Sequence, residues 1–170
     1  MTRKKLRQLV VVGLIFLSGG TTLMAHCEIP CGIYHDDLRL AMMSEHIDTI
    51  AKSLAGIKAA EAARPVDYNQ LVRWINNKDE HAVKIQEIVW QYFLTQRIKP
   101  TAAGNPAYDK YIRELTLLHE LSVYAMKAKQ STDPVVVDKL RELLQAFRAS
   151  YQGRAAASHE QRHGAAAAHK

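Results

Sequence analysis

Apolar residues recur along most of the chain at the three- and four-residue spacing of an amphipathic helix. The first such segment runs from about Asp37 to Ala63, and Pro65 ends the pattern. We expect Asp36 or Asp37 to cap the start of this helix with its side chain. Its apolar stripe consists of Leu40, Met43, Ile47, Ile50, Leu54 and Ile57.

Three further segments show the same spacing, and each follows a recognisable start signal. Asp67 can cap the first of them. Asn105 and Asp133 each stand directly before a proline, Pro106 and Pro134, and proline is favoured at the first position of a helix. These signals predict helices over residues 67–97, 105–129 and 133–151.

No part of the sequence alternates apolar and polar residues as a strand would, and no hairpin signal is present. Four amphipathic helices with short connections predict an all-α fold, an antiparallel up-and-down four-helix bundle over residues 35–151. Residues 152–170 contain alanine runs and three histidines, His159, His163 and His169. We expect them to form a disordered tail; its histidines could bind a metal weakly, although the composition favours a solvated tail.

Residues 1–25 have the organisation of a secretory signal peptide. Arg3, Lys4, Lys5 and Arg7 precede an apolar run from Leu9 to Leu17, which is too short for a permanent membrane span. Small and polar residues then lead to Ala25, where we expect a signal peptidase or maturation protease to cut. A lipoprotein signal fits less well, because His26 rather than a small residue stands before Cys27. The mature protein is therefore predicted to be exported, periplasmic or extracellular, without a stable membrane span.

The positive charge lies mostly outside the predicted bundle. The whole chain carries a net charge of +6, and residues 1–25 contribute four basic and no acidic residues, so the remainder carries +2. The tail accounts for this excess, and the bundle is close to neutral. We therefore expect no nucleic-acid partner.

Both cysteines of the chain lie in the nine residues that follow the expected cut, His26 to Tyr34. Cleavage would give this end a primary amine, an imidazole, the backbone amide of Cys27 and two thiolates. An amine, an amide nitrogen and two sulfurs can lie in one plane around a metal, which favours nickel or copper, whereas zinc prefers a tetrahedron. The alternative is an ordinary structural disulfide between Cys27 and Cys31.

The segment reads HCEIPCGIY, with His26, Cys27, Pro30, Cys31, Gly32 and Tyr34 in fixed positions, and it resembles the nickel hook of nickel superoxide dismutases. A looser resemblance, which includes Trp90 to Phe93, extends to about Tyr151. The resemblance to the nickel hook implies that residues 26–34 form a hook that binds nickel through His26, Cys27 and Cys31. It further implies cycling between nickel(III) and nickel(II), superoxide as substrate, and a homohexamer. The resemblance places Tyr34 and Tyr92 near the metal as catalytic residues, although Tyr92 also lies on an apolar helical stripe.

The resemblance has one departure. A glutamate of the first helix and an arginine behind it orient the axial histidine in better-known members of the family, and Met42 and Asn77 stand at the corresponding positions here. Glu45 is the nearest acidic candidate to replace the glutamate, although the sequence favours a solvent-facing carboxylate at this position. The three helical histidines, His46, His81 and His119, have no histidine or cysteine partner one turn away, and we expect them to be surface or core residues.

Two other functions remain open from the sequence. The same hook could belong to a helical bundle that binds nickel or copper without catalysis. Alternatively, the chain could be a structural helical module stapled by a disulfide between Cys27 and Cys31.

Overall fold

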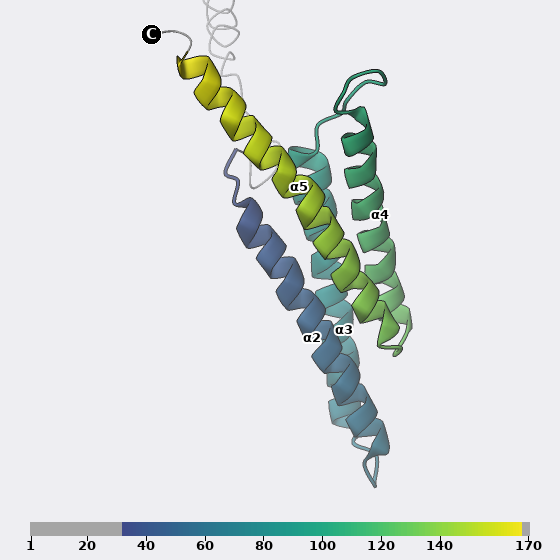
Figure 1. The fold of residues 1–170 in the computed structure, drawn as a ribbon. Coiled ribbons are helices and arrows are strands. Elements are labelled where there is room, and N and C mark those ends of the chain that lie inside the picture. Colours follow the sequence, from purple (N-terminus) through teal and green to yellow (C-terminus); the bar gives the residue numbers. More distant parts are fainter. Residues whose placement is uncertain (1–31, 168–170) are drawn as a thin grey trace, which may run out of the picture. The chain divides into compact units, whose positions relative to one another are not determined.

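The computed structural model describes residues 32–167, and beyond Gly153 it describes only the backbone. These residues form four long helices, and among them there is no strand. Successive helices run in opposite directions, and α2 and α4 each pack against both α3 and α5 around a common core (Figure 1). The predicted all-α four-helix bundle is confirmed. The elements are α2 (Asp36–Ala62), α3 (Tyr68–Glu87), the π-helix η1 (Ile88–Arg97), α4 (Tyr108–Gln130) and α5 (Val135–Ala167).

The core is built from the apolar stripes that the periodicity predicts. All six stripe residues of α2 are at most 5% exposed, and each such side chain stabilises the fold by about 1.5–3 kcal/mol relative to an exposed one. Phe93 and Phe147 meet edge to face near the centre, with ring centroids 4.9 Å apart. Gly56 is needed where α2 approaches α3, because a Cβ there would lie 2.5 Å from the ring of Trp74.

One predicted helix start is confirmed, and a second differs from the prediction by one residue, because α5 begins at Val135 and not at Pro134. Asp67 caps α3, and its side chain accepts a hydrogen bond from the backbone N–H of Gln70 at 3.0 Å. Asp133 accepts from the backbone N–H of Val135 at 3.0 Å, at the start of α5. These short polar side chains satisfy N–H groups that lack a partner within the helix.

The other two predicted caps are wrong. His35 occupies the N-cap of α2 and makes no capping hydrogen bond from its side chain. Asp36 instead lies inside the helix, where its carboxylate binds side chains from other helices. Asn105 accepts from the backbone N–H of Ala107 at 2.8 Å and so closes a turn, and α4 begins only at Tyr108.

A buried lysine joins α3 to the end of α4. Lys78 is 3% exposed, and its Nζ donates to the backbone oxygens of Ala128 at 2.6 Å and Lys129 at 2.8 Å. It also pairs with Asp79 at 2.8 Å. A positive charge is stabilised at a helix C-terminus, where carbonyl groups lack partners within the helix. Lys78 therefore closes the end of α4 with a side chain from α3.

The second predicted helix ends at Arg97 as expected, but its last ten residues are π-helical. The backbone N–H of Ile98 donates to the carbonyl of Phe93 at 2.8 Å, a five-residue step that widens the helix. In this geometry residues four and five positions apart share a face. Tyr92 and Arg97, five positions apart, both reach the same carboxylate on α2.

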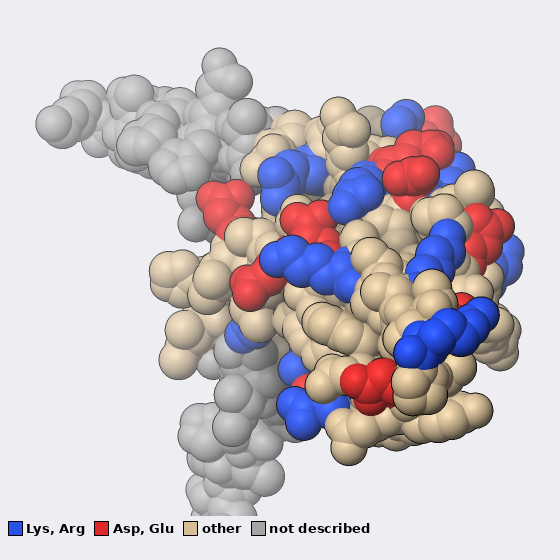
Figure 2. Space-filling model, turned by 90° about the horizontal axis from the view of Figure 1, so that it is seen from below, with Lys and Arg blue, Asp and Glu red and all other residues tan. Residues whose placement is uncertain are grey.

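The last helix continues past Tyr151, where the sequence pattern predicts its end. Its backbone is helical to Ala167, and residues 168–170 lie outside the described part of the chain. The physical reason is composition, because alanine has the highest helix propensity and this segment contains several alanines. Among the described residues, no helix is both long and apolar enough to cross a membrane. Figure 2 shows acidic and basic side chains intermixed on the face that it presents.

Candidate functional site

The predicted metal ligands His26, Cys27 and Cys31 lie outside the described residues, as does the expected cleavage after Ala25. The described chain begins at Gly32, directly after Cys31. Gly32 has a φ of +75°, in the left-handed region that favours glycine. The chain after the second cysteine therefore turns in a way that other residues adopt only with strain.

The structure brings together the two tyrosines that the resemblance singles out. Tyr34 precedes α2 and Tyr92 lies in η1, and their rings meet edge to face with centroids 6.1 Å apart. Tyr34 is 40% exposed, whereas Tyr92 is 2% exposed. Tyr92 is thus both a core residue and a neighbour of Tyr34.

The carboxylate of Asp36 organises the surroundings of these tyrosines. Its Oδ1 accepts from the hydroxyl of Tyr92 at 2.5 Å and from Nε of Arg97 at 2.8 Å. Its Oδ2 accepts from Nη2 of Arg97 at 2.6 Å and from the hydroxyl of Tyr151 at 2.8 Å. Arginine forms its strongest carboxylate pairs in this bidentate manner. Asp36 therefore joins α2, η1 and α5 at one point.

Two guanidinium groups lie over the tyrosine rings. The Arg97 guanidinium is 4.3 Å from the ring centroid of Tyr34, and that of Arg39 is 5.2 Å from the centroid of Tyr92. Such cation–π contacts fix the orientation of the ring. We call Tyr34, Asp36, Tyr92, Arg97 and Tyr151 the Asp36 cluster.

The cluster keeps its carboxylate charged and its buried hydroxyls protonated. Burial raises the pKa of Asp36, but the hydrogen bonds from Arg97, Tyr92 and Tyr151 outweigh it and leave the pKa below its usual value. Burial, followed by the hydrogen bond to Asp36, raises the pKa of Tyr151 to about 12 and also raises that of Tyr92. Both hydroxyls are therefore hydrogen-bond donors at neutral pH.

We expect Asp36→Asn to destabilise the bundle by about 2 kcal/mol at pH 7, because it removes the charge that pairs with Arg97. Because the pKa of Asp36 is lower in the folded protein than in the unfolded chain, ionised Asp36 stabilises the fold at pH values above its unfolded-state pKa of about 3.9. This stabilisation is lost as the pH falls through the folded-state pKa. Urea unfolding of both proteins should therefore show a difference that shrinks between about pH 5 and pH 2.

Asp37→Asn is the matched control, because Asp37 is exposed and, among the described residues, accepts one long hydrogen bond, from Gln152 at 3.3 Å. Its effect should be small and nearly independent of pH. An Asp36→Asn protein that unfolds like the Asp37→Asn protein at pH 7 would show that the cluster does not hold the helices together.

Sequence reasoning missed Asp36, Arg97 and Tyr151 as a group. Asp36 is a residue type that commonly caps helices, and Arg97 and Tyr151 stand at the expected ends of two helices, so nothing in the sequence indicated that the three side chains meet.

The structure also shows where Met42 and Asn77 lie, the two residues that replace the family's glutamate and arginine. Met42 accepts a long hydrogen bond from Arg39 at 3.8 Å. Asn77 donates a hydrogen bond to Ser53 at 2.9 Å. Ser53 lies about 25 Å along α2 from Asp36, at a rise of 1.5 Å per residue, so Asn77 is far from the Asp36 cluster.

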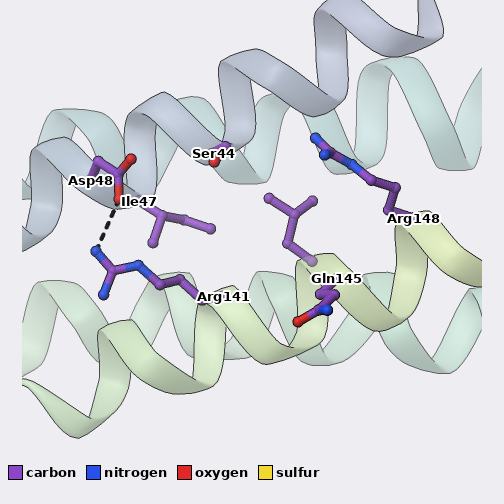
Figure 3. Close-up of a pocket in the computed structure, with 7 residues that line it drawn as sticks. Ser44, Ile47, Asp48, Arg141, Gln145 and Arg148 are labelled. Carbon is purple, nitrogen blue, oxygen red and sulfur yellow. Dashed lines mark hydrogen bonds and ion pairs between the residues drawn. The ribbon is translucent and has the colours of Figure 1, made fainter.

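A groove between α2 and α5 shows no comparable chemistry (Figure 3). Its charged residues include Asp48 and Arg141, which pair with each other at 2.9 Å. Ser44 and Gln145 also face it, but no histidine or cysteine lines it. Within the described part of the chain, no three histidine, cysteine or acidic residues gather closely enough to hold a metal. A metal site with three such protein ligands therefore has to include residues before Gly32 or beyond Gly153.

A helical bundle preceded in sequence by a segment rich in sulfur and nitrogen donors has the organisation expected of an all-α metalloprotein. Residues 21–154 match the family model of nickel-containing superoxide dismutase, and this match includes the donor-rich segment, the first three helices of the bundle and α5 as far as residue 154. The chain belongs to the nickel-containing superoxide dismutase family. It is an oxidoreductase with a nickel cofactor that acts on superoxide. No curated protein and no solved structure matches the chain significantly.

Proposed function

We propose that export and cleavage after Ala25 convert the chain into an active dismutase whose N-terminal residue is His26. The amine of His26, the backbone nitrogen of Cys27 and the thiolates of Cys27 and Cys31 would hold nickel, with the imidazole of His26 as a further donor. The chemistry of this donor set supports the assignment, because strong sulfur and nitrogen donors suit tetragonal nickel. Nickel held in this way supplies one-electron exchange with superoxide.

The contact between Tyr34 and Tyr92 carries the proposed roles of these two residues. The hydroxyl of Tyr92 is committed to Asp36, so Tyr92 acts by holding the ring of Tyr34 in place. Tyr34 makes no hydrogen bond from its side chain to another described residue, and it is half-exposed only three residues after Cys31. Its hydroxyl can therefore order water or an incoming anion beside the hook.

Tyr34→Phe tests this division of roles, because it removes the hydroxyl and keeps the ring. We expect nickel content to be unchanged and turnover to fall by about 3- to 10-fold, the value of one hydrogen bond. Inhibition by azide should become easier. Tyr68→Phe is the control, since Tyr68 is 72% exposed at the start of α3. Identical kinetics in the Tyr34→Phe and Tyr68→Phe proteins would make Tyr34 a packing residue.

We further propose that the mature chain forms a homo-oligomer, a homohexamer by analogy with the family. Val72, Val83 and Trp90 are 54%, 38% and 51% exposed. They follow one another at intervals of eleven and seven residues, which are close to whole numbers of helical turns. These exposed apolar side chains form a stripe, interrupted by Asn76, Glu80 and Glu87, on which we place the subunit contact.

Trp90→Glu places a charge on this stripe and should shift the processed protein to a smaller assembly, as measured by light scattering. Val135→Glu is the control, because Val135 is 63% exposed at the start of α5. A Trp90→Glu protein with the same mass as the parent would remove this stripe from the subunit interface.

A further inference from the structure

Two histidines from different helices face each other at a site separate from the Asp36 cluster. Nδ1 of His46 on α2 lies 3.1 Å from Nδ1 of His81 on α3. Their rings meet edge to face at 79°, with centroids 4.9 Å apart. His46 is ten residues from Asp36, or about 15 Å along α2 at 1.5 Å per residue. The pair therefore belongs to a different region of the bundle.

The spacing of the two nitrogens suits a shared metal ion. Imidazole nitrogens bind divalent transition metals at about 2.0–2.1 Å, so two nitrogens 3.1 Å apart would subtend about 100° at one ion. That angle lies between square-planar and tetrahedral values. Both side chains are half-buried, so the helices hold the rings while one side remains open to solvent.

The charges around the pair permit a cation. The pKa of each histidine is lowered, first by burial and then by neighbouring positive groups, and the carboxylates of Glu45 at both histidines and of Glu80 at His81 oppose this only in part, so both carboxylates favour positive charge here. Lys84 opposes it, but its Nζ is paired with Glu80 at 2.6 Å. Burial is the largest effect and lowers the pKa of both histidines, which keeps the imidazoles neutral and able to donate lone pairs.

We propose that His46 and His81 bind a divalent transition-metal ion through their Nδ1 atoms and thereby cross-link α2 and α3. Water completes the coordination, because no third protein ligand of the described chain is grouped with them. The site should prefer Cu²⁺ over Zn²⁺, following the usual order of affinity for nitrogen donors. With two protein ligands it should exchange its ion more readily than the N-terminal hook. This site does not depend on cleavage after Ala25.

The test uses the full chain with Cys27→Ser and Cys31→Ser, so that hook thiolates do not bind the added metal, and with His159→Gln, His163→Gln and His169→Gln, so that tail histidines do not bind it either. Zn²⁺ at about 100 times its dissociation constant should raise the melting temperature by about 5–10 °C, because only the folded state holds both histidines together. With Cu²⁺, the electron paramagnetic resonance spectrum should show a component with two bound nitrogens.

Single His46→Gln and His81→Gln changes should each abolish the Zn²⁺-induced rise and the two-nitrogen component. His119→Gln is the control, because His119 is exposed on α4. Each shift is measured against the same variant without metal, so lower starting stability does not hide the result. Lys84→Gln should tighten Zn²⁺ binding by about two- to threefold. If Zn²⁺ still raised the melting temperature of both the His46→Gln and the His81→Gln proteins, the two histidines would not bind the metal, and their contact would be only a hydrogen bond.

Discussion

Replacing Cys27 or Cys31 by serine is expected to abolish nickel binding and dismutase activity while leaving the helices intact. Loss of a residue that only supports a metal ligand costs about 10- to 100-fold in affinity, so loss of a thiolate ligand should cost more. The described core contains no residue before Leu40, so the bundle has its own source of stability. Nickel analysis, activity and far-ultraviolet circular dichroism measure the three quantities separately.

Ile29→Val is the matched control for the cysteine changes, because it alters the same segment and keeps both thiolates. It should retain nickel. If either serine variant lost helical signal in proportion to nickel, the cysteines would be structural, as in a disulfide-stapled module. Without nickel, the same two thiols could form a disulfide in the oxidising compartment to which we expect the protein to be exported.

The helices and the buried stripe of α2 could be predicted because burial follows the helical period. Asp67 and Asp133 were also predictable, since capping is a local interaction between neighbours in sequence. Asp36 was not, because its partners Arg97 and Tyr151 come from other helices. A pattern along one helix shows which face is buried, but it does not show which polar residues of two helices meet.

The same limit explains the histidine pair and the π-helix. A search for partners one turn away in sequence cannot find His46 and His81, which face each other from different helices. Residues 88–97 have the composition of an ordinary helix end. In the structure these residues form a π-helix, with hydrogen bonds between residues five positions apart, and this geometry lets Tyr92 and Arg97 both donate to the carboxylate of Asp36 on another helix.

The candidate metal site can be proposed from the sequence for a different reason. Its donors are neighbours in sequence, so their chemistry can be recognised without knowing the fold. The family match covers the segment that contains them. The roles of His26, Cys27 and Cys31 remain predictions, since these residues lie outside the described part of the chain.

The second large effect concerns the start of the mature chain. A protein that retains Ala25 before His26 should bind nickel poorly and show less than about 1% of the activity of a protein that starts at His26. The reason is that a peptide nitrogen binds a metal only after losing its proton, whereas a free amine donates its lone pair directly, so retaining Ala25 would replace the amine donor with a second amide, and Ala25 would also crowd the metal plane. One alanine added after Lys170 is the control, and it should leave both nickel content and activity unchanged.

Nickel content and superoxide turnover, measured side by side on chains that begin at His26 and at Ala25, test the proposed activation by cleavage. Mass spectrometry of the exported protein identifies which of these starts is natural. We expect an exported protein that begins at His26, with one nickel per chain and full activity, and an inactive protein when Ala25 is retained. Equal nickel content and equal activity in the two proteins would show that cleavage after Ala25 does not create the metal site.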